Sequence, residues 1–223
     1  MTTTSQVHND FTMMLVVHDA FRRDLSRIAS ALDAAAHGGA GRGDVPALME
    51  RWQWAAEQVH HHHGGEDAVL WPALREAVRD DARALQLLDR MEHEHGELAP
   101  LQAEVDRALH AYAAAPSAAT AQAALVPCRV FADALCAHLA HEERDAVPLL
   151  ESRLPPVALR RFEQRQQRQL GLRVAMTQFF PWLLDEALPQ RREHVLGQLP
   201  APLRWLVVCS TPGYRRRTAR AWV

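Results

Sequence analysis

A histidine followed four residues later by a glutamate occurs twice in the chain. His62 precedes Glu66, and His138 precedes Glu142. On a helix this spacing places the two side chains on one face, one turn apart. An imidazole nitrogen and a carboxylate oxygen together suit a first-row transition metal. A proline follows each glutamate by six residues, so the second copy keeps the register of the first and indicates an internal repeat.

Two further histidines extend this repeat. His18 lies 44 residues before His62, and His95 lies 43 residues before His138. Each half of the repeat therefore supplies one histidine from a first helix and a His/Glu pair from a second helix. Two related hairpins packed around a pseudo-twofold axis bring these side chains together in the core. The six candidate metal ligands are His18, His62, Glu66, His95, His138 and Glu142.

This ligand set predicts a site for two metal ions. Two glutamates near the axis can bridge the metals, which leaves two imidazoles for each. The charge of the cations is what makes two buried carboxylates tolerable. Ferritin-type oxidases use the same architecture, but they need Glu-x-x-His pairs that project into the core. The repeated unit here is His-x-x-x-Glu, which disfavours that class.

The run from His60 to His63 offers more histidines than the site needs. The helical register of the repeat favours His62 as the ligand and leaves His63 as the alternative. His60 and His61 are expected to be partly exposed. On the third helix, His93 lies roughly 200° around the axis from His95 and is expected to face away from the site.

The composition indicates a helical protein without a membrane span. The chain has 223 residues, 48% of them apolar, and a formal net charge of −2, so no overall charge drives nucleic-acid binding. The first ten residues lack the features of a signal peptide, and no run of about 18 apolar residues occurs. Three cysteines, an odd number, are most simply read as reduced thiols in a cytoplasmic protein.

Apolar periodicity predicts an all-α, up-down four-helix bundle. The expected helices cover residues 11–36, 44–79, 80–114 and 118–152. Short connections between them require neighbouring helices to run antiparallel. In the second helix, Gly64 and Gly65 predict a bend or bulge, and Pro72 predicts a kink just beyond the ligands.

A change of composition after residue 154 predicts a second unit. We expect a four-helix bundle over residues 1–154 and a helical extension over residues 155–223, broken by several prolines. The extension contains Phe179, Phe180 and Trp182. Large apolar side chains gathered in one segment rarely stay exposed, so these residues are expected to pack on the bundle.

On these residues the chain resembles the hemerythrin-like, or HHE cation-binding, family, and above all its bacterial members. The likeness covers about residues 11–152, and its strongest parts are the segments 18–23 and 63–72. It implies a non-haem di-iron centre with an oxo or hydroxo bridge. In that reading Glu66 and Glu142 bridge the irons, His18 and His62 hold one iron, and the other iron is held by His95 and His138.

One position departs from the family pattern. The family often has a further histidine on the third helix, four residues before the one that matches His95, and Met91 stands there instead. The departure implies an open or water-filled coordination position beside His95 and His138. The resemblance predicts a protein that binds O2, peroxide or nitric oxide. Alternatives are a peroxidase-like or catalase-like enzyme and a metal-storage or structural protein. No nucleic-acid partner and no stable membrane association are expected, and the sequence leaves the oligomeric state undetermined.

Overall fold

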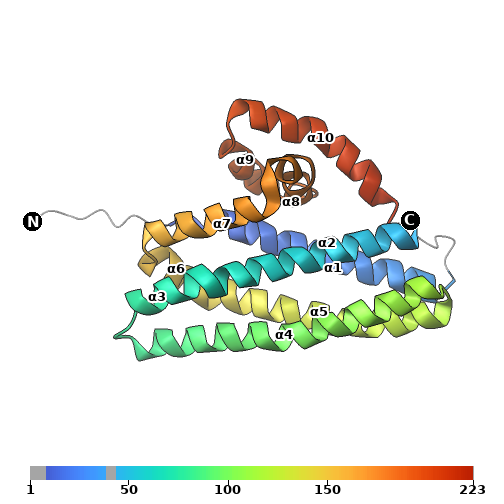
Figure 1. The fold of residues 1–223 in the computed structure, drawn as a ribbon, viewed down its shortest axis with the longest axis horizontal. Coiled ribbons are helices and arrows are strands. Elements are labelled where there is room, and N and C mark those ends of the chain that lie inside the picture. Colours follow the sequence, from blue (N-terminus) through green and yellow to red (C-terminus); the bar gives the residue numbers. More distant parts are fainter. Residues whose placement is uncertain (1–8, 39–43, 223) are drawn as a thin grey trace, which may run out of the picture.

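Four long helical segments lie side by side along the long axis of the molecule, and the chain reverses direction at each connection (Figure 1). The structure, a computed structural model, describes residues 9–38 and 44–222. These residues contain no strand, so the all-α prediction is confirmed. In chain order the four segments are α1 (Thr12–Ala36), then α2 (Val45–Gly65), η1 (Glu66–Leu70) and α3 (Trp71–Ala77), then α4 (Ala82–Ala114), and finally α5 (Ala118–His141), η2 (Glu142–Ala146) and α6 (Val147–Arg153).

Three of these segments begin at a side chain that accepts hydrogen bonds from the first helical turn. The Asp44 carboxylate accepts from the Ala47 amide at 3.1 Å at the start of α2, and Asp81 caps α4 in the same way. At the start of α5, Ser117 and Thr120 form a reciprocal capping box. The caps fix where each helix starts and therefore which residues reach the layer of histidines and glutamates.

Two five-residue π-helical segments, η1 and η2, interrupt the α-helical winding at equivalent places in the repeat. One begins at Glu66 and the other at Glu142. Each segment ends just before an Xaa-Pro pair that contains Pro72 or Pro148. A proline has no amide hydrogen, and its ring clashes with the carbonyl four residues earlier, so a wider turn before it relieves the clash. The second copy lacks a glycine pair, so the repeated signal is the proline and not the glycines.

The layer of candidate ligands lies between two apolar clusters. On α4, Met91 belongs to one buried cluster and Leu98 to the other, and His95 stands between them. The first cluster surrounds Trp71, and the second contains Phe131 and most of the remaining buried side chains. Apolar packing on both sides keeps the polar layer in a region from which water is excluded.

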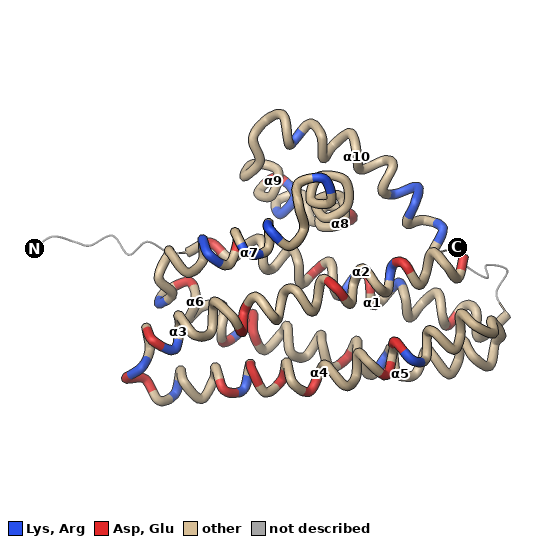
Figure 2. Tube along the Cα trace, viewed as in Figure 1, with Lys and Arg blue, Asp and Glu red and all other residues tan. Residues whose placement is uncertain are grey.

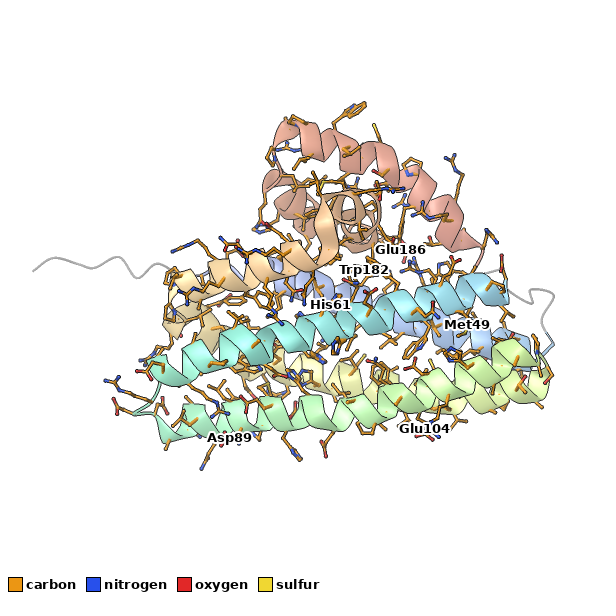
Figure 3. The ribbon with its side chains drawn as sticks, viewed as in Figure 1. Met49, His61, Asp89, Glu104, Trp182 and Glu186 are labelled. Atoms are coloured by element: carbon orange, nitrogen blue, oxygen red, sulfur yellow. The ribbon has the colours of Figure 1, made fainter. Side chains whose placement is uncertain are left out.

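Residues after 154 form an extension that lies across α1 and α2 (Figure 1). Its elements are α7 (Pro156–Val174), η3 (Ala175–Phe179), α8 (Phe180–Leu183), α9 (Pro189–Gly197) and α10 (Ala201–Ala219). Trp182 lies where the extension meets the helices beneath it (Figure 3). Its indole is fully buried and donates a hydrogen bond to Asp24 Oδ2 at 3.0 Å. Arg51 donates to the same oxygen at 2.8 Å, so a buried ionic group joins the extension to the bundle.

The continuous helix from Ala118 to Arg153 is long and apolar enough to cross a membrane by length and composition alone. In this fold it packs against α1 and α4 along its length. It also carries His138 and Glu142, both of which are buried. About 39% of its apolar stretch is buried in the described structure, so core packing accounts for part of its apolar character.

The extension also contacts the ligand-bearing helix α2 at its last residue. A side-chain carbon built on Gly65 would lie 2.6 Å from Gln166 Nε2 and 2.8 Å from Phe162 Cε2. The Gln166 amide donates a hydrogen bond to the His61 carbonyl at 3.1 Å. Helix α7 can therefore approach α2 this closely only because residue 65 has no side chain.

We predict that Gly65→Ala lowers the free energy of unfolding, whereas Gly64→Ala does not. Overpacking a closed contact costs about 1–3 kcal/mol. Gly64 is the matched control, because a carbon added there meets nothing within 4 Å. Alanine at that position gains up to about 1 kcal/mol of helix propensity. Urea unfolding followed by circular dichroism measures both variants, and equal stabilities would contradict the contact between α7 and α2.

Candidate metal centre

The histidines and glutamates singled out in the sequence converge in the middle of the four helical segments. They form two adjoining groups, and within each group the potential ligand atoms lie within 4.8 Å of one another. The first group contains His18, His62, Glu66 and Glu142, and the second contains His63, His95 and His138. All seven residues are buried. The structure thus brings together the six predicted side chains and adds His63, the alternative to His62.

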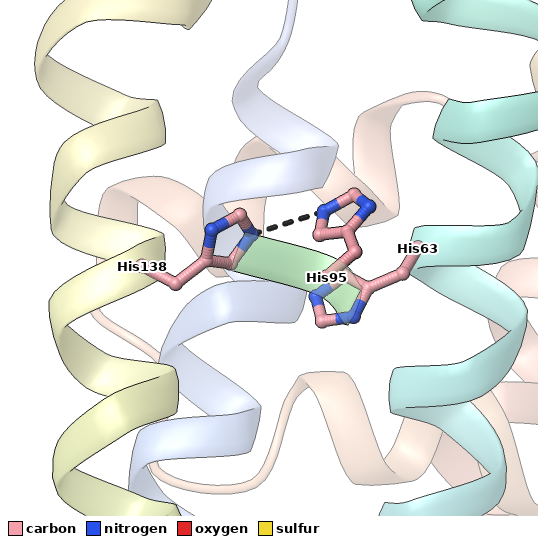
Figure 4. Close-up of side chains that lie close together, drawn as sticks. All are labelled: His63, His95 and His138. Carbon is pink, nitrogen blue, oxygen red and sulfur yellow. Dashed lines mark hydrogen bonds between the residues drawn. The ribbon is translucent and has the colours of Figure 1, made fainter. Parts of the chain in front are cut away.

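In each group two imidazoles point their Nε2 atoms at each other. His18 Nε2 lies 2.9 Å from His62 Nε2, and His95 Nε2 lies 3.1 Å from His138 Nε2. Figure 4 shows the second pair together with His63. Which of these nitrogens carries a proton follows from the partners of the opposite ring atoms.

Carboxylates occupy the Nδ1 side of three of these rings. His18 Nδ1 lies 2.9 Å from Glu143, His95 Nδ1 lies 2.8 Å from Asp67, and His138 Nδ1 lies 2.8 Å from Glu94. An ionised carboxylate only accepts hydrogen bonds, so Nδ1 carries the proton and donates it. When such a ring is neutral, its Nε2 atom is unprotonated, which is the form of histidine that binds a metal. Burial lowers the pKa of His18 and His138 and so favours this form, whereas the effect of burial on His95 is outweighed by the carboxylates of Asp67 and Glu66, which raise its pKa.

The Glu143 carboxylate is ionised. Burial alone would raise its pKa, but the hydrogen bonds from His18 and Arg22 lower that pKa to about 2. The pKa of His18 is itself lowered to about 4, chiefly because the ring is buried. At neutral pH His18 is therefore a neutral ring held in one tautomer by an anionic neighbour.

Glu66 spans the two groups. Its Oε1 lies 3.0 Å from His62 Nε2, and its Oε2 lies 3.5 Å from His95 Nε2. On the other side of the first group, Glu142 Oε2 lies 3.4 Å from His18 Nε2. None of the four oxygens of these glutamates has a hydrogen-bond partner in the described part of the chain. Fully buried carboxylates without partners are rare unless an ion compensates their charge.

The two glutamates respond to each other's charge. Burial raises the pKa of Glu142 well above its ordinary value, and the nearby Glu66 carboxylate raises it further. Burial would also raise the pKa of Glu66, but His62 and, to a smaller extent, His95 lower it. Without a cation, therefore, the site holds one carboxylate ionised and disfavours ionisation of the second. A bound cation removes that penalty and favours the ionised form of both.

His63 approaches the second group from the end of α2. Its ring stacks on His95 with the centroids 4.1 Å apart, and it meets the His138 ring edge-on at 5.1 Å. Its Nε2 is buried and has no hydrogen-bond partner in the described residues. Burial and the neighbouring rings lower its pKa well below the ordinary value, so the ring is neutral. Met91 implied an open coordination position beside His95 and His138, and in the structure the His63 imidazole lies next to these two rings.

The donor set fits a metal centre. The first group offers two imidazoles and two carboxylates, and the second offers three imidazoles and lies next to the second oxygen of Glu66. Where both facing Nε2 atoms are unprotonated, as the Nδ1 partners of His95 and His138 favour, the two nitrogens repel unless a cation lies between them. Nitrogen and carboxylate donors in this mixture suit iron, manganese or zinc better than calcium or magnesium. Each of the two groups therefore offers donors that could hold a transition-metal ion.

The sequence did not reveal Glu94, one of the three carboxylates that orient the ligands. Glu94 accepts hydrogen bonds from both His138 and His141. It stands one residue before His95 and fits no repeated motif, because the equivalent residue of the first half is Val17. His60 and His93 are exposed and His61 is half-buried, as their positions around the helix predicted.

Comparison with known proteins identifies the bundle but not the extension. Residues 9–150 match the family described as Hemerythrin HHE cation binding domain. No curated protein and no solved structure matches the chain. The family match confirms the resemblance seen in the sequence, and it ends before α7 begins.

We predict that Glu142→Ala loses most of the bound metal, whereas Glu143→Ala keeps more than half of it. Glu142 points unpaired oxygens into the centre, and its removal leaves two cations with less compensating charge. Glu143 only orients His18, and losing such an outer partner typically costs about 10–100-fold in metal affinity. Metal analysis after gel filtration of both variants measures the difference. The reverse order would show that the register of the fourth helical segment is wrong.

We predict that His63→Ala lowers metal content or shifts its spectrum, whereas His60→Ala leaves both unchanged. His63 directs an unpartnered nitrogen toward His95 and His138, while His60 is exposed on the same helix. Both changes remove one imidazole from the same histidine run, so weak binding by the run itself affects them equally. Unchanged metal content and absorption in His63→Ala would leave the original six ligands as the complete set.

Proposed function

Because the chain belongs to the hemerythrin HHE cation-binding domain family, we propose that it holds a non-haem di-iron centre that binds a small molecule such as O2, peroxide or nitric oxide. The family match and the His/Glu groups support cation binding by this chain. The identity of the metal as iron, the number of ions, the oxo or hydroxo bridge and the choice of small molecule are parts of the proposal. We also infer that the four helical segments form an up-down bundle of the hemerythrin type.

The observation that carries the proposal is the position of Glu66 between two groups of unprotonated nitrogens. One of its oxygens lies near His62 and the other near His95, and neither accepts a hydrogen bond in the described residues. A carboxylate in that position is suited to bridging two ions. We assign His18 and His62 to one iron, and His63, His95 and His138 to the other. Glu142, whose Oε2 lies 3.4 Å from His18 Nε2, would supply the second carboxylate shared by the irons.

The two sides of the centre have unequal donors. The His63 side offers three imidazoles and the His18 side offers two. Iron, when bound, would supply redox chemistry and a coordination position for a small molecule. If Glu66 and Glu142 are shared by both irons, as proposed, the His18 side would have one protein donor fewer than the His63 side. That leaves more room for an added ligand, so we assign small-molecule binding to the side of His18 and His62. This assignment differs from the expectation based on Met91, which placed the open position beside His95.

Residues around the centre hold the ligands still and keep bulk water away. Phe21 packs against the His62 ring with the centroids 5.6 Å apart, and Trp71 lies 6.4 Å from the His95 ring. Both aromatic side chains are fully buried. Asp67 and Glu143 keep the Nδ1 protons of His95 and His18 in place. The protein thus supplies fixed, neutral nitrogen donors in surroundings of low dielectric.

A reducing compartment such as the cytoplasm is part of the proposal. Cys128, Cys136 and Cys209 are all free thiols. Burial raises the pKa of Cys128 to about 12, so this thiol is unreactive at neutral pH.

We expect about two irons per chain in protein isolated aerobically, with charge-transfer bands in the near ultraviolet. The stoichiometry follows from two adjoining donor groups that share Glu66. Metal analysis and absorption spectra before and after addition of azide or peroxide test the expectation, and continued consumption of added peroxide would indicate an enzyme. Stoichiometric zinc alone, or no metal after iron-replete expression, would contradict the proposed function.

A further inference from the structure

The extension and the bundle carry opposite net charges. Residues 155–223 contain 12 arginines and four acidic residues, although the whole chain has a net charge of only −2. The remainder of the chain is correspondingly acidic. In Figure 2 the basic segments of the extension lie along α7, near α9 and at both ends of α10. A near-neutral protein therefore presents one strongly basic part.

Helix α10 has an apolar strip on its outer side. Trp205 is 69% exposed, Val208 is 46% exposed and Leu206 is 39% exposed. The opposite side packs on the rest of the protein through Val207, Thr211, Tyr214 and Thr218, which are buried. The exposed side chains are thus not required for the fold of the extension, and their outward position needs another explanation.

Arginines flank this apolar strip and no carboxylate interrupts it. Arg204 stands before Trp205 and Leu206, and Arg215, Arg216 and Arg217 follow near the end of the helix. The sequence of α10 contains no Asp or Glu. Arg215 is paired with Asp185, but Arg216 and Arg217 have no acidic partner within salt-bridge distance among the described residues. Two exposed guanidinium groups therefore remain available for an anionic partner.

We propose that the outer side of α10 binds reversibly to the surface of an anionic lipid membrane. Tryptophan and aliphatic side chains enter the headgroup region, and arginines bind lipid phosphates; this combination is typical of helices that lie on a membrane. Anionic lipids are concentrated in the cytoplasmic leaflet, where basic segments bind them. Such peripheral binding differs from the stable membrane association that the sequence gave no reason to expect. The proposal does not depend on the metal centre.

Charge and apolar character together favour lipid over the other polyanions. A nucleic acid pairs with arginine and stacks on tryptophan, but it offers no surface on which Leu206 and Val208 are buried. The acidic bundle of a second copy would attract the arginines, so self-association is the competing occupant that the experiment must distinguish. Binding to lipid requires no rearrangement, because these side chains are already exposed.

The test is flotation of the full-length protein with vesicles of phosphatidylcholine alone or of phosphatidylcholine with one-quarter phosphatidylglycerol. We expect binding to the anionic vesicles only, weakened at least fivefold by 0.5 M salt. Trp205→Ser/Val208→Asp and Arg216→Glu/Arg217→Glu should each reduce that binding at least fivefold. Circular dichroism of the variants verifies that the fold is kept.

Matched controls show whether a loss of binding comes from the changed surface of α10, called here the patch, or from a change in net charge or in side-chain polarity anywhere on the protein. Val126→Asp changes an exposed valine of the bundle, which is 56% exposed on α5. Arg107→Glu/Arg153→Glu makes the same change in net charge as Arg216→Glu/Arg217→Glu, but on the bundle. Both controls should bind like the wild type. Equal loss in controls and patch variants, no binding to anionic vesicles, or a dimer abolished by the patch variants in the absence of lipid would overturn the proposal.

Discussion

The structure depends on keeping two carboxylates and several imidazole rings close together in one buried layer, and the surrounding helices hold them there. Glu66 and Glu142 are fully buried and lack hydrogen-bond partners in the described residues, while histidine nitrogens face one another at about 3 Å. Such an arrangement is repulsive when no ion is bound and strongly attractive around a cation. Apolar clusters on both sides exclude the water that would otherwise relieve the repulsion. The fold therefore favours binding of a cation by the residues of this layer.

Each half of the repeat supplies an acidic residue that orients a histidine of the other half. Asp67, next to Glu66, accepts a hydrogen bond from His95 of the other half, and Glu143, next to Glu142, accepts one from His18. Both acids lie in the π-helical segments that begin at the glutamate of each His/Glu pair. Two adjacent residues point in directions about 100° apart on a helix, so one can face the metal layer while the next reaches the outer side of a neighbouring ring.

The two halves of the repeat carry different residues at two positions near the metal centre, and these differences make the two sides of the centre unequal. His63 adds an imidazole to one group, whereas the equivalent residue in the second half is Leu139, a buried core residue. Gly65 permits α7 to lie against α2, and its counterpart His141 is bonded to Glu94. Each difference breaks the pseudo-twofold symmetry. The repeat thus provides the paired glutamates, and the residues that differ between its halves make the two donor groups unequal and give α7 a place to pack against α2.

The sequence by itself determined the helices, the internal repeat and the six side chains that share its register, because helical spacing of three and four residues is a local property. It also indicated the family through the same residues. Only the tertiary structure decided that His63 joins His95 and His138, that Glu94 holds His138, and that the extension reaches Asp24 through Trp182. Those relations depend on how α2, α4 and α5 are rotated and stacked against one another. That rotation is set by the packing of whole helices and by the π-helical segments, and the spacing of residues along one helix does not specify it.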